Sequence, residues 1–167
     1  PDIVVMGKPM GNGFPIGAVA CTREVAEAFD TGMEFFSTFG GNPVACAAGR
    51  AVLQVVQEEG LQERAQQTGQ LLLQGLRALQ SEYACIADVR GHGLFLGVEL
   101  SKNGQPMTDE ARYLINRMRR LGILMNTDGP NNNVLKIKPP MSFGPQAAEE
   151  LLERLHRELR RMDGFIK

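Results

Sequence analysis

Hydrophobic and polar residues recur along the chain with two periods, and these periods predict short strands at the start and helices further on. Ile3–Met6 is a β-branched apolar run before a stretch rich in glycine and proline, which is typical of a buried strand. Residues 16–21 form a second strand candidate. Thr22 is placed to cap a short helix through Phe29, and residues 32–41 are expected to be loop or strand.

Two long helices are predicted next. Asn42 followed by Pro43 is a good helix start, because asparagine caps free N–H groups and proline lacks only an N–H that would be unbonded anyway. This helix should cover residues 43–58, and a second should cover residues 61–82. The positions of the second helix that are expected to face a core are Leu72, Leu76 and Leu79.

The remaining residues alternate between strands and helices. Strands are predicted at residues 86–89 and 94–100, on either side of a turn at residues 90–93. A helix over residues 108–120, two short strands at 123–125 and 134–137, and a helix over about 145–162 follow. The last helix is expected to bury Leu151, Leu152, Leu155 and Leu159. The pattern indicates an α/β piece over residues 1–60 and an α+β unit over residues 61–167.

Composition narrows the function classes. The chain has 167 residues, 43% of them hydrophobic and 22% charged, which is typical of a globular protein. The net charge of −1 argues against nucleic acid as a partner, and no apolar run is long enough for a membrane helix. Three cysteines without a CxxC spacing predict neither disulfides nor a metal site, so a reducing, cytoplasmic location is expected. The chain starts without Met and is expected to be part of a longer protein.

Lys8 is the first candidate for chemistry. It ends the first predicted strand and is followed by a turn that contains Gly11 and Gly13, which leave room for a bulky flat ligand. A lysine amine in such a place can form a Schiff base with a carbonyl compound. The alternatives are an ordinary surface lysine and a simple tight turn, and the loop is not a phosphate-binding Walker sequence.

Residues 1–19, PDIVVMGKPMGNGFPIGAV, closely resemble the cofactor-lysine segment of class III aminotransferases. The resemblance implies that Lys8 forms a Schiff base with pyridoxal 5'-phosphate and then moves a proton between substrate and cofactor. It also implies a small-molecule primary amine as substrate.

Residues 36–43, FSTFGGNP, resemble a second landmark of that family. The resemblance implies that Thr38, with Ser37 and nearby backbone, donates hydrogen bonds to the cofactor phosphate of the partner subunit, so a homodimer is expected. Hydroxyl and N–H donors before a helix N-terminus form a local anion site. The alternative is that Thr38 only caps a turn.

Residues 89–100, VRGHGLFLGVEL, resemble the strand by which the family enters its small domain. Arg90 either holds the turn or lines the substrate entrance. His92 either acts as a base or, as an exposed turn residue, does no chemistry, since the lysine already transfers the proton.

Lys136 lies in the stretch VLKIKPPM, where many amino-acid transaminases of the family have an arginine that grips the substrate carboxylate. Lysine offers a point charge in place of a planar fork, so substrate recognition should differ. With residues 127–130 before it, this stretch most resembles the alanine–glyoxylate aminotransferase 2-like branch, which includes amine-phosphate phospho-lyases. The alternative is that Lys136 and Lys138 simply face solvent.

The resemblance implies a fold-type I pyridoxal-phosphate enzyme, of which this chain holds the C-terminal part. Residues 1–60 would end the large cofactor-binding domain, and residues 61–167 would form the linking helix and small domain. The expected function is amine transfer, with elimination of phosphate and ammonia from an amine phosphate such as phosphoethanolamine as an alternative. An alternative of another class is a non-catalytic truncated fragment or dimerisation module, because upstream parts of the cofactor site are absent from these residues.

Overall fold

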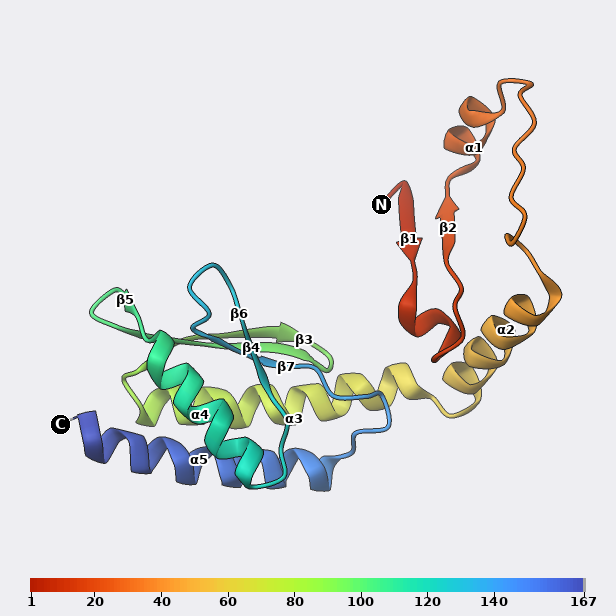
Figure 1. The fold of residues 1–167 in the computed structure, drawn as a ribbon. Helices are drawn as coiled ribbons and strands as arrows, with labels where there is room; N and C mark the ends of the chain where they lie inside the picture. Colours follow the sequence, from red (N-terminus) through yellow and green to blue (C-terminus); the bar gives the residue numbers. More distant parts are fainter. Residues whose placement is uncertain (167) are drawn as a thin grey trace. The chain divides into compact units, whose positions relative to one another are not determined.

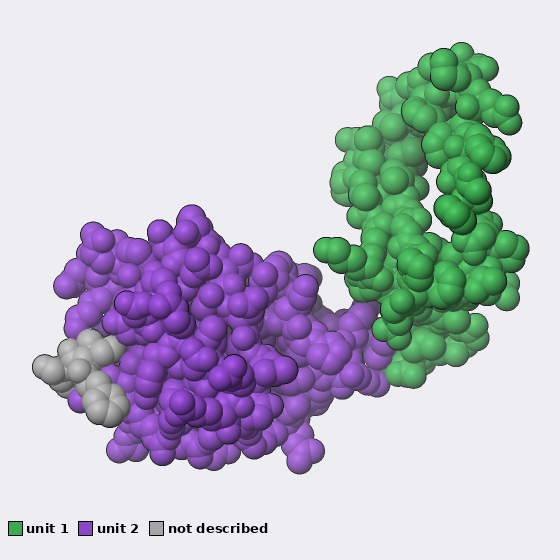
Figure 2. Space-filling model, in the orientation of Figure 1, with its two compact units in different colours: residues 1–60 green, residues 61–167 purple. Residues whose placement is uncertain are grey.

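The chain divides into two compact units in the computed structural model, which describes residues 1–166 and the side chains of residues 1–164. Unit 1 is Pro1–Gly60 and unit 2 begins at Leu61. Figure 2 shows the two units in separate colours. Gly60 lies two residues after the helix α2 (Pro43–Glu58), so the boundary falls just beyond the predicted end of that helix.

Unit 1 opens with a two-stranded antiparallel sheet. The strands β1 (Ile3–Met6) and β2 (Ala18–Cys21) pair in a register that runs from Ile3↔Cys21 to Met6↔Ala18. A 3-10 turn, η1 (Lys8–Gly11), reverses the chain between them (Figure 1). The short helix α1 (Arg23–Phe29) follows, with the Thr22 hydroxyl accepting the Val25 N–H at 3.4 Å. The predicted strands and capped helix are confirmed, although β2 begins later than predicted.

The helix α2 begins as its sequence predicts. The Asn42 side-chain oxygen accepts the N–H of Ala45 at 2.9 Å, and Pro43 occupies the first turn. Residues 32–41 contain no strand, so the loop alternative holds for this stretch.

The prediction that the first strand is buried is wrong within this chain. Val5 is 76% exposed, and the other three residues of β1 are exposed as well. Among residues 1–60, β1 has β2 as its strand neighbour, and no helix of unit 1 packs extensively against the sheet. The apolar run therefore predicts a strand correctly, but burial requires a covering layer that unit 1 does not contain.

Unit 2 combines an antiparallel sheet with three helices. Its strands are β3 (Ile86–His92), β4 (Phe95–Lys102), β5 (Gln105–Pro106), β6 (Asn126–Asp128) and β7 (Val134–Ile137). The sheet order is β3-β4-β7-β6, with β5 paired to β4. The helices are α3 (Leu61–Glu82), α4 (Thr108–Arg120) and α5 (Pro145–Ile166). The three helices confirm the predicted ones, with α5 running a turn further than expected.

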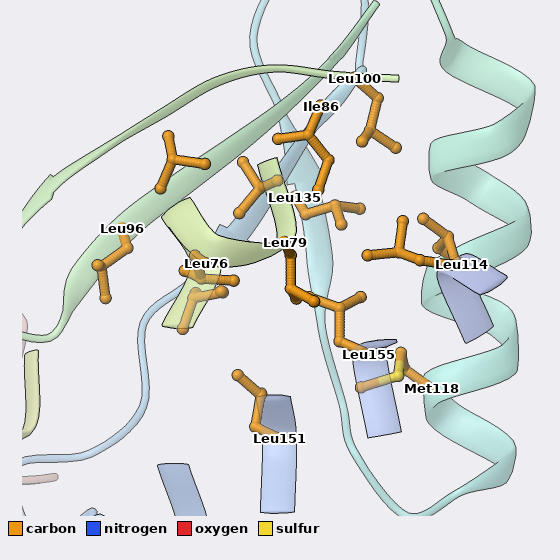
Figure 3. Close-up of a cluster of buried hydrophobic side chains, with 14 of the residues drawn as sticks. Leu76, Leu79, Ile86, Leu96, Leu100, Leu114, Met118, Leu135, Leu151 and Leu155 are labelled. Carbon is orange, nitrogen blue, oxygen red and sulfur yellow. The ribbon is translucent and has the colours of Figure 1, made fainter. Parts of the chain in front are cut away.

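The core of unit 2 lies between one face of this sheet and the helices. Alternate residues of a strand point to opposite faces, so Leu96, Val98 and Leu100 of β4 all enter the core. Leu135 and Ile137 of β7 do the same. Figure 3 shows strand residues of this cluster meeting leucines from all three helices. The predicted helix positions are confirmed as buried, except Leu152, which is half-buried: Leu72, Leu76, Leu79, Leu151, Leu155 and Leu159.

Two local predictions in unit 2 are wrong. β3 continues to His92 because it pairs with β4 as far as Phe95, so the turn is shorter than the predicted 90–93. Residues 123–125 are not a strand, and Leu124 is 84% exposed. The polar β6 pairs with β7 in their place, because a backbone ladder at a sheet edge does not require apolar side chains.

A buried carboxylate joins α4 and α5. The Glu158 side chain is fully buried, and its two oxygens lie 2.7 Å from Arg117 Nε and 2.8 Å from an Arg161 nitrogen. Arg157 lies 3.7 Å from the same carboxylate. Burial alone would raise the pKa of Glu158, but the bond to Arg117 and the charges of the arginines outweigh it and lower the pKa below its ordinary value.

The lowered pKa of Glu158 predicts an acid-dependent stability. A carboxyl whose pKa is depressed by folding stabilises the folded state fully above its unfolded value and loses that contribution as pH falls through the folded pKa. The melting temperature of unit 2 should therefore fall as pH drops below about 4.5, the ordinary value, and Glu158→Gln should remove part of that slope. Glu153→Gln, at an exposed position of α5, should leave the slope as in the parent. Equal slopes for Glu158→Gln and the parent would contradict the assignment.

Candidate active site

Lys8 begins the turn between β1 and β2. Its backbone φ is 44°, in the left-handed region that residues with a side chain seldom adopt. The turn is closed by the Met10 N–H donating to the Gly7 carbonyl at 3.2 Å and the Asn12 N–H donating to the Pro9 carbonyl at 3.0 Å. The Lys8 side chain is exposed within unit 1. A strained backbone at a candidate catalytic residue is a frequent feature of functional sites.

Small residues hold this turn against α2. Gly11 is buried, and a Cβ built there would lie 2.7 Å from Ile16 Cγ2. On α2, a Cβ at Gly49 would lie 3.3 Å from Ile16 Cδ1, and Ala45 is buried as well. The glycines therefore allow a close approach of the turn and the helix, which fixes the backbone that carries Lys8.

The second motif forms an ordered turn before α2. The Ser37 hydroxyl oxygen accepts the Gly40 N–H at 3.0 Å, which leaves the hydroxyl proton of Ser37 free to be donated. Asn42 donates its side-chain N–H to the Phe39 carbonyl at 2.8 Å. Thr38 is exposed. Two hydroxyl groups thus lie just before a helix start, the place where anions bind in many proteins.

A hollow of about 550 Å³ brings the two motifs of unit 1 together. Met10 and residues 15–18 line it from the lysine turn, and residues 39–42 line it from the second motif. Lys8, Ser37 and Thr38 are not among the lining residues, while Arg50 of α2 contributes a cation to the lining. The structure therefore places both landmarks around one space, and Arg50 is a lining residue that sequence reasoning missed.

Lys136 lies on β7 in unit 2, where it is paired with an acid. Its ammonium nitrogen is 2.5 Å from an Asp128 oxygen, and the Lys136 side chain is 31% exposed. The other oxygen of Asp128 accepts the Gly129 N–H at 2.9 Å. The bond to Lys136, followed by the bond to Gly129, holds the pKa of Asp128 below its ordinary value.

A second hollow, of about 440 Å³, opens over the sheet beside this pair. Its lining includes Arg90, His92, Gly97, Asp128 and Lys136. These residues alternate with core residues along their strands, so the hollow lies on the face of the sheet opposite the helices.

Arg90 links the strands beside the turn, and its alternative role at the substrate entrance stays a prediction. One of its terminal nitrogens lies 2.5 Å from Asp88 and 2.8 Å from Glu99, so it braces β3 against β4. It also lines the hollow. His92 is exposed and is the last residue of β3, where it pairs with Phe95.

The comparisons with known proteins identify the family. The family model for aminotransferase class-III matches residues 1–159, which is most of the chain. The chain belongs to the class III aminotransferase family. The resemblance of its motifs to that family is thereby confirmed, while the roles of Lys8, Ser37, Thr38 and Lys136 stay predictions.

This class III chain is similar to proteins of two named activities. It is 50% identical over 91% of its length to an alanine–glyoxylate aminotransferase 2-like protein of Drosophila melanogaster. It is 46% identical over 98% of its length to an ethanolamine-phosphate phospho-lyase homolog of Caenorhabditis elegans. The chain spans 32% and 36% of the lengths of these two relatives, or about a third.

The chain also shares its fold with part of a solved structure. The class III chain superposes with a TM-score of 0.91 and 41% identity on a phospholyase from Arthrobacter in complex with phosphoethanolamine, over 96% of this chain and 39% of that one. The predicted fold class, the α/β fold of a fold-type I pyridoxal-phosphate enzyme, is confirmed. Among the residues that the structure describes, no helix is both long enough and apolar enough to span a membrane.

The sequence analysis included Asp128 only within residues 127–130 and gave it no role of its own. The pairing Asn126↔Lys136 and Asp128↔Val134 makes Asp128 a diagonal neighbour of Lys136 across the β6–β7 hairpin. Side chains at such positions are within reach of a long lysine. Both charged residues are evident in the sequence, but only the register of the hairpin shows that they form an ion pair.

The Asp128–Lys136 pair can be tested in this chain. Lys136→Met should raise the pKa of Asp128 toward its ordinary value, because the largest cause of the depression is removed while the Gly129 N–H remains. Carbon NMR of the Asp128 carboxyl during a pH titration measures the change. Lys138→Met removes an exposed lysine from the next outward position and should have no effect on Asp128. An unchanged Asp128 titration in Lys136→Met would refute the pairing.

Proposed function

We propose that the protein that carries this chain is a pyridoxal-phosphate-dependent enzyme that acts on a small primary amine, with Lys8 bonded to the cofactor. Membership of the class III family supports the cofactor, and the observation that carries the proposal is the strained, glycine-bounded turn at Lys8. When bound, the cofactor supplies an electron sink. Lys8 would hold it and then carry a proton to and from the substrate.

The residues of unit 1 fit such a cofactor. A planar ring needs an approach free of side chains, and a Cβ built at Gly7 or Gly13, on either side of the turn, would meet nothing within 4 Å. Ser37 and Thr38 offer hydroxyl donors for a phosphate, which we assign to the partner subunit's cofactor in a homodimer. On this proposal residues 1–60 end the large cofactor-binding domain, and residues 61–167 form the linking helix and small domain.

The exposed apolar side chains of unit 1 support a partner. Phe29, Met33, Phe35, Phe36 and Phe39 are all more than 70% exposed. A concentration of large apolar side chains on a surface marks an interaction site. A non-catalytic dimerisation module would explain the same feature, and cofactor binding separates the two proposals. We place the protein in the cytoplasm, because its cysteines point to a reducing compartment.

Covalent capture tests the role of Lys8. After incubation with pyridoxal 5'-phosphate and reduction with borohydride, the cofactor should remain on the peptide that contains Lys8, where mass spectrometry detects it. Lys8→Ala should abolish the adduct because the only bonding amine proposed is removed. Lys102→Ala, which changes an exposed lysine of β4, should retain it. Absence of any adduct on Lys8 would favour the non-catalytic alternative for this chain.

Transamination, the transfer of the amine to an oxo acid, is the leading reaction. The second candidate is a phospho-lyase reaction, in which an amine phosphate and one water give phosphate, ammonia and an aldehyde. Lys136 is compatible with it, since the arginine fork that grips a substrate carboxylate is absent and a lysine ammonium binds phosphate as a point charge. The similarity to a phospholyase and to a phospho-lyase homolog points the same way.

Phosphate release distinguishes the two reactions. With phosphoethanolamine and no oxo acid, a phospho-lyase should release phosphate, whereas a transaminase should not turn over. If Lys136 meets the phosphate, Lys136→Gln should reduce kcat/KM by roughly tenfold or more, because a charge-assisted contact is lost. A colorimetric phosphate assay measures both results. Turnover that requires an oxo acid and releases no phosphate would establish transamination.

A further inference from the structure

The hollow of unit 2 is a charged depression whose floor is a glycine. In the register of the sheet, Gly97 of β4 pairs with Arg90 on one side and with Lys136 on the other. A Cβ at Gly97 would lie 3.1 Å from Val134 Cγ1, so the neighbouring Val134 leaves little room for a side chain at this position. Two cationic side chains therefore face one space across a residue that has no side chain.

The two cations of the hollow are not equally available. Arg90 is shared by two carboxylates, Asp88 and Glu99, so its charge is more than compensated. Lys136 has a single acid partner in the described structure, Asp128. An anion in the hollow is therefore attracted mainly by Lys136, and the nearest charge that repels it is that of Asp128.

Asp128 is held in place and does not simply follow Lys136. Its second oxygen accepts the Gly129 N–H at 2.9 Å, and its backbone belongs to β6, which pairs with β7. A ligand that draws Lys136 toward itself therefore leaves a carboxylate that stays at the edge of the hollow. The Gly129 N–H also lowers the pKa of Asp128, so this carboxylate remains charged at neutral pH after Lys136 has moved to a ligand.

We propose that Asp128 is a specificity-determining residue of the substrate site, which restrains Lys136 and weakens the binding of doubly charged anionic groups relative to singly charged ones. This inference rests on the proposed function, in which Lys136 meets the anionic end of the amine substrate. The repulsion between Asp128 and a ligand is proportional to the ligand's charge. The free energy needed to break the Asp128–Lys136 ion pair, by contrast, is the same for every anion. A ratio of two affinities therefore isolates the electrostatic role.

Two ligands of matched shape measure that ratio. Phosphoethanolamine and 2-aminoethylsulfonate carry the same two-carbon amine and a tetrahedral anionic group, with close to two negative charges and with one, respectively, at pH 8. Calorimetry on the cofactor-loaded protein gives both dissociation constants. In Asp128→Asn the preference for phosphoethanolamine over the sulfonate should increase roughly fivefold, the effect of one unit charge a few ångströms from the extra ligand charge.

Matched variants separate this role from a structural one. Asp128→Glu keeps the charge and should keep the ratio of the parent. Glu99→Gln removes one negative charge from the same face of the sheet, but from the partner of Arg90, and should change the ratio less than twofold. Equal weakening of both ligands in Asp128→Asn would show a purely structural role and overturn the proposal. A shift in Glu99→Gln as large as that in Asp128→Asn would also overturn it.

Failure of this inference is distinguishable from failure of the proposed function. If the cofactor is captured on Lys8 but the ratio does not change in Asp128→Asn, only the role of Asp128 is refuted. If no cofactor is captured on Lys8 but the ratio, measured in the same way on the protein without cofactor, still changes in Asp128→Asn, the proposed catalysis is refuted and the anion selectivity of the hollow stands.

Discussion

The pairing of β4 with β7 decides which side chains unit 2 buries in its core and which it leaves on the open face of the sheet. Because alternate side chains of a strand point to opposite faces, the register that places Leu96 and Leu135 in the core also places Gly97 and Lys136 on the open face. A slip of one residue would exchange the two sets and expose the core leucines to water. The apolar core thus fixes the position of a charged residue that contributes nothing to it.

Unit 2 has one buried carboxylate and one half-exposed ion pair. Glu158 is buried and surrounded by arginines, so its charge is fully compensated inside the fold. Asp128 and Lys136 are only partly covered, and each remains accessible from the hollow. A buried pair is costly to open, whereas a half-exposed pair exchanges partners readily. The first arrangement serves the packing of α4 against α5, and the second is suited to recognition.

Unit 1 is held together by the close packing of a few small residues and not by a large hydrophobic core. Its buried residues are Gly11, Ala45 and Gly49, and Ile16 fits between them. This contact holds the lysine turn beside α2, while β1 and the aromatic residues of the following loop stay exposed. Such a unit holds the candidate lysine on a closely packed turn and leaves large apolar side chains exposed.

Local sequence signals were sufficient to predict most of the helices and strands. Asn42-Pro43 and Thr22 predicted two helix starts because a cap depends only on neighbouring residues, and the spacing of leucines predicted the buried sides of α3 and α5. The lysine and FSTFGGNP motifs were sufficient to indicate the class III family. Burial of β1, the extent of the β3–β4 turn and the place of β6 could not be read from local signals, because each depends on which strand or layer lies alongside.

The sequence by itself determined the family, the helices and the candidate residues, since these are properties of short segments. Only the tertiary structure decided that Lys136 has Asp128 as its partner and that Arg90 lies across Gly97 from it. The reason is physical: an ion pair between strands depends on hairpin register, and register is set by the whole apolar face of the sheet.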